Sequence, residues 1–256
     1  MPIIKVANLS KSFEKKNVLN DINFEVEEGQ SLVILGGSGS GKTVLLRCIM
    51  GLLRPDSGYV NVNNKIIGNL NKKQLYEVNK SVGMCFQMAA LFDSMTVEEN
   101  VGFALMRHTK MTNKERAVRV EECLNMVGLR GTQKLRPSEL SGGMKRRVGF
   151  ARAIALKPKI LLFDEPTTGL DPVMTDVINR IILNLKRQMG VTSITITHDL
   201  KSAFAIADVI AILFRGKCLA IQKPNDFKTN TNEVIQQFLR GDANGPFLDD
   251  PPPPTD

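Results

Sequence analysis

A glycine-rich segment that ends in Lys and Thr is the first stretch whose residue types and spacing could do chemistry. Its spacing is G-x-x-x-x-G-K-[ST], the pattern of a phosphate-binding P-loop. It lies between the apolar run 32–35 and the apolar start of a helix at 44–46. Glycines let backbone N–H groups surround an anion, and the start of the following helix adds the positive end of its dipole. The predicted phosphate-binding residues are Gly36, Gly37, Ser38, Gly39, Ser40, Gly41, Lys42 and Thr43.

Two carboxylates later in the chain complete this chemistry. Lys42 is expected to reach the β- and γ-phosphates of a nucleotide, and Thr43 to offer its hydroxyl to Mg²⁺. Asp164 and Glu165 follow the apolar run 159–163, which is typical of a strand buried in a parallel sheet. Ligand-binding residues of open α/β sheets lie at such strand ends. We expect Asp164 to support the Mg²⁺ water shell and Glu165 to orient or deprotonate the attacking water.

Gln87 and His198 also follow strand-like runs, 81–85 and 193–197. For Gln87, side-chain chemistry alone favours a hydrogen bond within a loop over a ligand contact. His198 is predicted to contact the γ-phosphate, because it would lie beside the P-loop; a loop histidine with internal partners is the alternative. The other histidine, His108, has no comparable context and receives no role.

A second glycine motif precedes a long helix that is expected to run through residue 155. Ser141 is a plausible N-cap, and Gly142 and Gly143 would let the backbone approach another group closely. The motif could form a second anion-binding helix terminus or merely cap the helix. Asp171 is predicted to cap another helix, with Pro172 at its first position. Phe13 is either a core residue or a platform for a purine ring, and spacing does not separate the two.

These residues must be positioned by strands and helices of an α/β fold. Strands are expected at 3–6, 21–26 and 31–35, with a hairpin at 59–67 around Asn63 and Asn64. From 88 to about 158 the signals are helical, including capping boxes that start at Thr96 and Thr112. The chain is therefore expected to contain a mostly parallel sheet, N-terminal strands and an inserted helical subdomain. A short helix is expected at 232–239, and the proline-rich end should be extended and mobile.

Composition agrees with a globular chain and argues against a membrane-spanning or secreted protein. The 256 residues are 43% hydrophobic and 23% charged, and no apolar run approaches the roughly 20 residues that span a bilayer. The N-terminus lacks the features of a signal peptide, so a cytosolic location is expected. The net charge of +8 is weak support for a nucleic-acid partner, because the densest basic cluster, 145–147, is expected on a solvated helix face. The single cysteines, predicted to be buried thiols, are Cys48, Cys85, Cys123 and Cys218.

The motifs occur in the order typical of ABC-transporter ATPases, and residues 3 to 240 resemble that family. The resemblance implies an ATPase that uses ATP and Mg²⁺, with residues 1–240 as the ATPase domain and 241–256 as a tail. It also implies a head-to-tail homodimer, in which Ser141, Gly142 and Gly143 close over ATP on the partner's P-loop. By the same resemblance, Gln87 contacts Mg²⁺ and senses the permease, Phe13 stacks on adenine, and Asp171 acts across the dimer.

One departure narrows the resemblance. The family signature usually has glutamine at its fifth position, whereas this chain has Met144, which cannot make the hydrogen bonds of glutamine. Leu-Ser-Gly-Gly-Met followed by Lys145-Arg146-Arg147 is similar to ATPases of Mla/Mce lipid-transport systems. That similarity implies phospholipid movement between inner and outer membranes and a peripheral location at the cytoplasmic face of the inner membrane. It also implies an MlaE-like permease, an Mce-domain protein and a STAS-domain partner.

Two alternatives remain at this point. The chain could serve an ABC importer of another small solute. It could also be a clamp that acts on nucleic acid or ribosomes. Clamps of that kind usually carry two ATPase domains or a long coiled coil, and this chain shows one set of motifs. We therefore expect no nucleic-acid partner.

Overall fold

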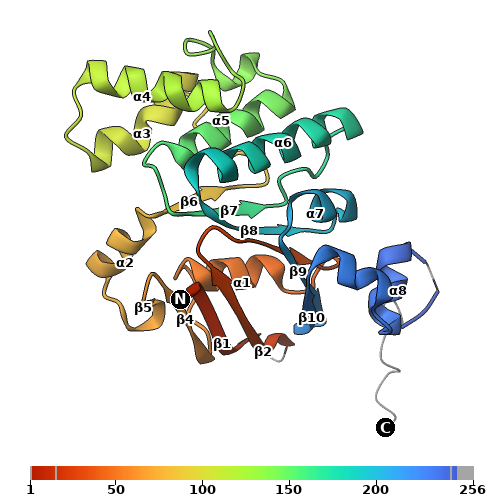
Figure 1. Cartoon of the computed structure of the whole chain (residues 1–256). Coiled ribbons are helices and arrows are strands. Elements are labelled where there is room, and N and C mark those ends of the chain that lie inside the picture. Colours follow the sequence, from red (N-terminus) through yellow and green to blue (C-terminus); the bar gives the residue numbers. More distant parts are fainter. Residues whose placement is uncertain (1, 15, 243, 247–256) are drawn as a thin grey trace.

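Two β-sheets form the frame of the molecule, and helices pack between and above them (Figure 1). The structure is a computed structural model that describes residues 2–14, 16–242 and 244–246. The 4-stranded sheet has the order β2-β1-β4-β5, and the 6-stranded sheet has the order β10-β9-β3-β8-β7-β6. Residues 247–256, which hold most of the predicted tail, lie outside the described residues.

The N-terminal sheet is antiparallel, as expected, and its strands are longer than the sequence indicated. Its strands are β1 (Pro2–Phe13), β2 (Lys16–Glu27), β4 (Ser57–Val62) and β5 (Lys65–Ile66). Register shifts interrupt the β1–β2 pairing, which explains why the alternation of apolar residues fades after residue 6. The predicted hairpin is confirmed: Asn63 and Asn64 have φ values of 51° and 62°, as a tight two-residue turn requires.

The larger sheet is parallel except at one edge. Its strands are β3 (Ser31–Leu35), β6 (Val82–Cys85), β7 (Ile160–Asp164), β8 (Thr192–Thr197), β9 (Val209–Phe214) and β10 (Lys217–Gln222). Only β10 pairs antiparallel with its neighbour, β9. The expected α/β fold, with a mostly parallel core and antiparallel N-terminal strands, is confirmed.

Both faces of the larger sheet are buried, which is why its strands are almost continuously apolar. In β3, Leu32 and Ile34 face a core shared with α1 (Lys42–Ile49) and the N-terminal sheet. Val33 and Leu35 face the opposite core, beneath the other helices. This alternation fixes the register of the strand, because a slip of one residue would exchange the two faces.

The segment between β6 and β7 is helical, as predicted. It contains α3 (Val97–His108), α4 (Asn113–Met126), a 3-10 turn η2 (Pro137–Glu139) and α5 (Gly142–Ile154). The capping boxes of Thr96 with Glu99 and of Thr112 with Glu115 are both present. Figure 1 shows α3 and α4 at the end of the molecule farthest from the N-terminal sheet. Whether this segment acts as a separate subdomain stays a prediction.

The remaining helices include two α-helices that the sequence analysis did not predict. They are η1 (Ile67–Asn69), α2 (Lys72–Asn79), α6 (Pro172–Met189), α7 (Leu200–Ile206), η3 (Pro224–Thr229) and α8 (Glu233–Arg240). The unpredicted α-helices are α7, which Asp199 caps, and α2, which starts with a capping box of Asn71 and Gln74. Asn and Gln can supply the same reciprocal bonds as Thr and Glu, and this pairing could have revealed the helix.

Two other sequence predictions can be compared with the fold. Within the described residues, every helix is too short or too polar to cross a membrane. Cys48, Cys85 and Cys123 are buried free thiols, whereas Cys218 is half-buried. Burial raises the pKa of the Cys48 thiol to about 11, so it is protonated near neutral pH.

Candidate active site

The P-loop connects the end of β3 to the start of α1, as the sequence predicted. Gly41 has a φ of 105° and lies where a Cβ atom would come within 2.7 Å of the Val18 carbonyl oxygen. Both the dihedral and the close approach require glycine at this position. The Ser40 hydroxyl is buried and has no hydrogen-bond partner among the described residues. A polar atom left unpaired beneath a glycine loop fits a site built for an oxygen-rich anion.

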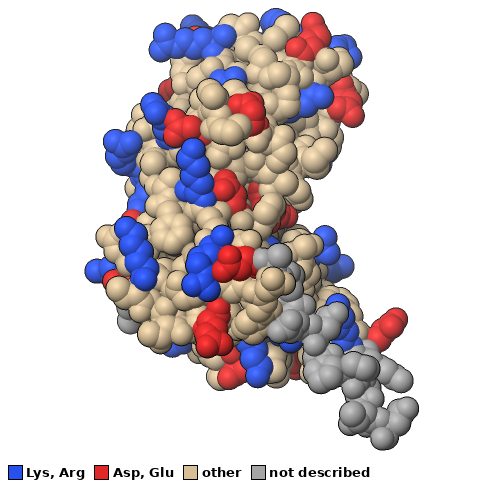
Figure 2. All heavy atoms as spheres, turned by 90° about the vertical axis from the view of Figure 1, so that its right-hand side faces the viewer, with Lys and Arg blue, Asp and Glu red and all other residues tan. Residues whose placement is uncertain are grey.

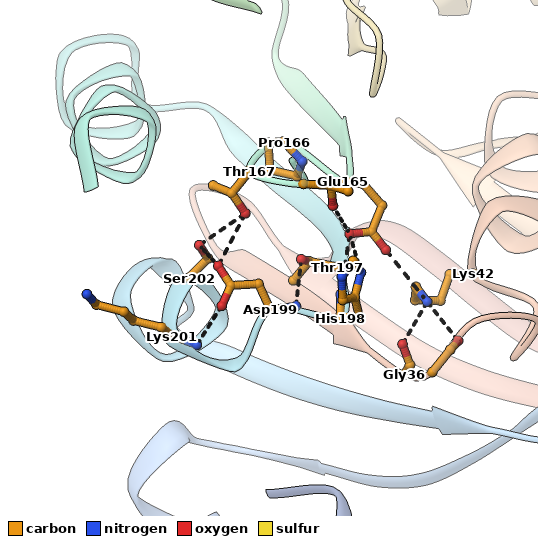
Figure 3. A network of polar contacts seen from close by, with 12 residues as sticks. Gly36, Lys42, Glu165, Pro166, Thr167, Thr197, His198, Asp199, Lys201 and Ser202 are labelled. Carbon is orange, nitrogen blue, oxygen red and sulfur yellow. Dashed lines mark hydrogen bonds and ion pairs between the residues drawn. The ribbon is translucent and has the colours of Figure 1, made fainter. Parts of the chain in front are cut away.

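Lys42 lies inside this loop and is only 7% exposed. Its Nζ donates to the carbonyl oxygens of Gly36, at 2.7 Å, and Gly37, at 3.0 Å. The same Nζ lies 3.7 Å from Oε1 of Glu165 (Figure 3). Burial lowers the pKa of the Lys42 ammonium, and the charges of Glu165 and Asp164 oppose that shift. The ammonium therefore lies in a low-dielectric site where a further anionic partner would be bound strongly.

Glu165 follows β7 directly and is held in an uncommon backbone conformation, with φ of 48°. Its backbone N–H donates to the Ile196 carbonyl of β8 at 2.9 Å. Its Oε2 accepts a hydrogen bond from the Thr168 hydroxyl at 2.9 Å and lies 3.0 Å from Nδ1 of His198. With Nδ1 donating to the carboxylate, Nε2 is the ring nitrogen that can meet another partner.

The loop that carries His198 is anchored by a polar network beside the site (Figure 3). The Asp199 carboxylate accepts hydrogen bonds from the hydroxyls of Ser202, at 2.5 Å, and Thr167, at 3.3 Å. Thr167 lies two residues after Glu165, so the network ties the loop after β7 to the loop after β8. Ser202 in turn accepts from the buried Asn179 of α6 at 3.0 Å. The network therefore links the loop that carries Glu165 to the loop that carries His198.

A cavity of about 510 Å³ lies in front of these groups. Gly37, Ser38, Gly39, Lys42, Thr43, Gln87, Asp164, Glu165, His198 and Phe238 line it. Gly36, Ser40 and Gly41 form the buried base of the same loop. The structure thus brings three remote segments of the chain, around residues 40, 87 and 165, to the same cavity as His198.

The groups predicted to hold Mg²⁺ are Thr43, Gln87 and Asp164, and all three line this cavity. The described residues contain no group of three or more His, Cys, Asp or Glu side chains that could hold a metal ion. Mg²⁺ commonly takes only one or two protein oxygens and completes its shell with water and phosphate, so this donor set fits it. Burial and the neighbouring Glu165 raise the pKa of the Asp164 carboxyl, while Arg47 and Lys42 lower it by smaller amounts.

Five of the predicted nucleotide-binding residues lie outside this cavity. Ser141 is exposed and caps α5 by accepting from the Met144 N–H, and Gly142 faces open space. Gly143 is buried, and a Cβ atom there would meet the Met174 methyl at 2.5 Å. Asp171 is exposed and caps α6, as predicted.

Phe13, the fifth of these residues, is 44% exposed at the end of β1. The alternative of a core position is therefore wrong, and part of the ring is open to solvent. The Lys11 Nζ lies 5.5 Å from the centre of the ring. The same Nζ is paired with the Asp56 carboxylate at 2.6 Å, so its charge already has a partner.

Three features of the site were not recognised in the sequence. Phe238 of α8 lines the cavity from a segment about 70 residues away in sequence from Glu165, and no local pattern indicates such a contact. Thr168 binds Glu165, but a threonine in a loop is too common to be a signal. The basic cluster at 145–147 was expected on a solvated face, and this is wrong for Arg146, which is 8% exposed. Its guanidinium turns inward and donates to three backbone carbonyl oxygens of two loops of the site.

Comparisons with known proteins decide the family. The family described as ABC transporter matches residues 19–168, more than half of the chain. The chain belongs to the ABC transporter family. It is accordingly an ATPase that uses ATP with Mg²⁺. ATPases of this family work as dimers together with a membrane permease.

Individual relatives match over nearly the whole chain. It is 40% identical over 247 residues to the "Intermembrane phospholipid transport system ATP-binding protein MlaF" of Escherichia coli K12, covering 94% of this chain and 92% of that protein. It is 39% identical over 244 residues to the "Probable ribonucleotide transport ATP-binding protein mkl" of Mycobacterium leprae, covering 95% of this chain and 70% of that protein.

A solved structure agrees with the fold. A dimeric ATP-binding cassette in a post-hydrolysis state, bound to ADP and Pi, is 31% identical, with a TM-score of 0.80. The match covers 86% of this chain and 98% of that chain.

Proposed function

We propose that the cavity around Lys42 and Glu165 is the hydrolytic half of an ATP site, with a defined role for each side chain. The loop 36–43 and Lys42 bind the β- and γ-phosphates. Thr43, Asp164 and Gln87 hold Mg²⁺, which when bound supplies positive charge to the phosphate oxygens. The proximity of these groups in one cavity supports these roles.

Glu165 orients the attacking water and accepts its proton, and His198 contacts the γ-phosphate. The observation that carries this proposal is the paired position of Glu165 between Lys42 and His198. A carboxylate that accepts hydrogen bonds on one oxygen and faces a cation with the other is fixed in direction. Holding a base in a productive direction is a large part of its catalytic value.

The second half of the site comes from another copy of the chain. Ser141, Gly142 and Asp171 are exposed and do not line the cavity. The resemblance nevertheless assigns Ser141 and Gly142 to nucleotide contact and gives Asp171 a role across the dimer. A head-to-tail homodimer would bring these residues to a nucleotide, because it would place the start of α5 of one copy over the P-loop of the other. Phe13, with its exposed ring, would stack on the adenine.

Two substitutions test the roles in the ATP site. Lys42→Ala should weaken ATP binding, measured by equilibrium titration, because no other ammonium lines the cavity among its described residues. Glu165→Gln should keep ATP binding and lower turnover by roughly 10²- to 10³-fold, because an amide cannot accept the proton. Full turnover in Glu165→Gln would show that another group is the base.

The transported substrate is proposed to be a phospholipid or related lipid, moved between the inner and outer membranes. The name of the E. coli relative and its coverage of 92% support this assignment. The name of the M. leprae relative supports a ribonucleotide as the second candidate substrate.

As the ATPase of a lipid transporter, the chain would act as a peripheral subunit at the cytoplasmic face of the inner membrane, with an MlaE-like permease. An Mce-domain protein and a small STAS-domain protein are further proposed partners.

A groove next to Gln87 offers a docking surface for the permease. It has a volume of about 330 Å³, and Lys80, Val82, Gly83, Met84, Phe86, Ala90, Phe92, Phe103, Ala104, Arg152, Ala153 and Leu156 line it. Phe86 is 41% exposed and Phe92 is 42% exposed. Large apolar side chains left in contact with water commonly mark an interface. A permease segment in this groove would contact the loop that carries Gln87.

The substrate assignment is tested by purifying the chain from membranes with its partners and identifying the lipids and proteins recovered. Recovery of a permease and stimulation of ATP hydrolysis by phospholipid vesicles, but not by ribonucleotides other than ATP, would support lipid transport. Stimulation by a ribonucleotide alone would favour the second candidate. Recovery with ribosomes and no permease would contradict both.

A further inference from the structure

Arg146 of α5 joins two loops of the active site through its guanidinium. Nη2 donates to the Gln87 carbonyl oxygen at 2.9 Å. Nη1 donates to the Pro166 carbonyl oxygen at 3.0 Å. Both terminal nitrogens donate to the Thr168 carbonyl oxygen, each at 2.9 Å. One side chain therefore fixes the loop that carries Gln87 against the loop that carries Glu165.

The burial of this guanidinium makes the junction costly to break. The residue is 8% exposed, and in the described part of the chain no carboxylate lies within ion-pair distance of it. The hydrogen-bond partners of the guanidinium are the carbonyl oxygens of Gln87, Pro166 and Thr168. A buried charge that loses its hydrogen bonds is strongly unfavourable, so the loops and the guanidinium hold one another in a single arrangement.

A second arginine of α5 supports the same loop at another point. The guanidinium of Arg152 donates to the Ala89 and Ala90 carbonyl oxygens, both at 2.7 Å. Ala89 and Ala90 have φ values of 59° and 47°, which are unfavourable for residues with a side chain. Arg152 thus holds the strained part of the loop, while Arg146 alone of the two also reaches the Glu165 loop.

We propose that Arg146 is a positioning residue for ATP hydrolysis, which sets the distance between the Gln87 loop and the Glu165 loop. It does not line the cavity, and it acts by holding the backbone on both sides of it. Because Ser141 caps α5 and Gly142 begins it, the same helix also links both loops to the signature segment. A movement of the helix would be transmitted to Gln87 and Glu165 together. This inference rests on the proposed catalytic role of Glu165.

The planar fork of arginine is what the junction requires. Its two terminal nitrogens point at three carbonyl oxygens at once, whereas the lysine ammonium is a single point that can reach fewer of them in a fixed geometry. Arg146→Lys therefore keeps the charge and removes the fixed geometry. Small errors in the position of catalytic groups can cost on the order of 10²-fold in rate.

The test compares steady-state ATP hydrolysis by the full chain, with and without Arg146→Lys. We expect kcat to fall by roughly 10- to 100-fold while KM and the Kd for ATP change less than about 3-fold, because the P-loop is untouched. Arg147→Lys is the matched control, since Arg147 is the next residue on α5 and its Nη1 donates to the Gly128 carbonyl, outside the site. This control should keep kcat within about 3-fold of the unmodified chain.

A double variant separates this proposal from the role of Glu165. In a Glu165→Gln background, Arg146→Lys should lower the residual turnover by less than about 3-fold, because the base that it positions is already gone. If Glu165→Gln alone kept full turnover, the catalytic assignment would fail, independently of Arg146.

Three results would overturn the proposal. They are unchanged kcat in a folded Arg146→Lys chain, an equal loss in Arg147→Lys, and a loss that appears wholly in the Kd for ATP. If Arg146→Lys does not fold, Arg146→Gln takes its place, because a neutral amide avoids burying an unpaired charge and can still donate to the carbonyls. The results expected for kcat and for the Kd for ATP are then the same as for Arg146→Lys.

Discussion

Glu165 and His198 meet through Oε2 and Nδ1, which lie 3.0 Å apart at the ends of two adjacent parallel strands. The register of the strands explains the meeting, because Asp164 of β7 is paired with Ile196 of β8. Glu165 and His198 are each the first residue after their strand, so their side chains start close together. The carboxylate orients the imidazole through Nδ1, which leaves Nε2 as the ring nitrogen that can meet another partner.

This pairing predicts different outcomes for the two histidines of the chain. His198→Ala should lower turnover by roughly 10²-fold, because it removes a group directed at the developing charge. His108→Ala is the control: its Nδ1 lies 2.5 Å from the Tyr76 hydroxyl, between α3 and α2, and outside the cavity. It should leave turnover within about 3-fold. Equal rates for both variants in a steady-state ATPase assay would disprove the role of His198.

The exposed position of Ser141 predicts a defect in assembly and not in nucleotide binding. In a Glu165→Gln background, ATP should drive dimer formation, measured by light scattering after size exclusion. Adding Ser141→Arg should abolish the dimer, because the new side chain would enter the space meant for the partner's nucleotide. ATP binding by the single chain should persist within about 3-fold, since the P-loop is intact.

The control for this assembly prediction is Ser94→Arg, at an exposed serine in the loop before α3. It should dimerise normally with ATP. Normal dimerisation of Ser141→Arg would rule out a composite site that uses the start of α5.

The open ring of Phe13 predicts a loss of ATP affinity without a loss of stability. Phe13→Ala should cost about 0.5–1.5 kcal/mol of stacking, or roughly 2- to 12-fold in Kd for ATP. The melting temperature should barely change, because the ring is 44% exposed and contributes little to the core. Tyr59→Ala, at a ring that is 37% exposed on β4, should leave the Kd unchanged. An unchanged Kd in Phe13→Ala would contradict adenine stacking.

The raised pKa of Asp164 predicts that Asp164→Asn stabilises the fold while it impairs hydrolysis. A carboxyl whose folded pKa lies above its unfolded value of 3.8 binds its proton more readily in the folded chain. Its charge therefore lowers the free energy of unfolding at pH values above the folded pKa, and the cost disappears as pH falls toward 3.8. Asp164→Asn should be more stable than the unmodified chain at pH 7, with a difference that shrinks as pH falls.

Urea unfolding at pH 7 and at lower pH measures this difference, and an ATPase assay with increasing Mg²⁺ measures the functional cost. We expect roughly 10²-fold slower hydrolysis in Asp164→Asn, because the amide is a poorer partner for the Mg²⁺ shell. A variant that is less stable at pH 7 would show that Asp164 contributes to folding through contacts other than its charge.

Local patterns were sufficient wherever a residue and its partner are close in sequence. The capping boxes at Thr96 and Thr112, the hairpin at Asn63 and the cap at Asp171 follow from bonds that span two or three residues. The buried strands could also be predicted, because a parallel sheet covered on both faces requires continuous apolar runs. The prediction failed for α2, although its Asn71 cap is a local signal of the same kind.

Contacts between distant segments had no such signal. Nothing around residue 146 indicates that its side chain is buried, because a run of three basic residues is typical of a helix face in contact with water. The carbonyls that receive Arg146 come from residues 20 and 59 positions away. Phe238 likewise reaches the cavity only because η3 and α8 return the chain to the P-loop side of the sheet.

Residue types at short spacing were enough to predict the chemistry, because a P-loop, a strand-end Asp-Glu pair and a Ser-Gly-Gly helix start are each local patterns. These patterns did not indicate which of the groups share one cavity. The fold places Lys42, Glu165 and His198 together and leaves Ser141 exposed. Strand order and helix packing set the distances between segments far apart in the chain, and no short-range pattern carries that information.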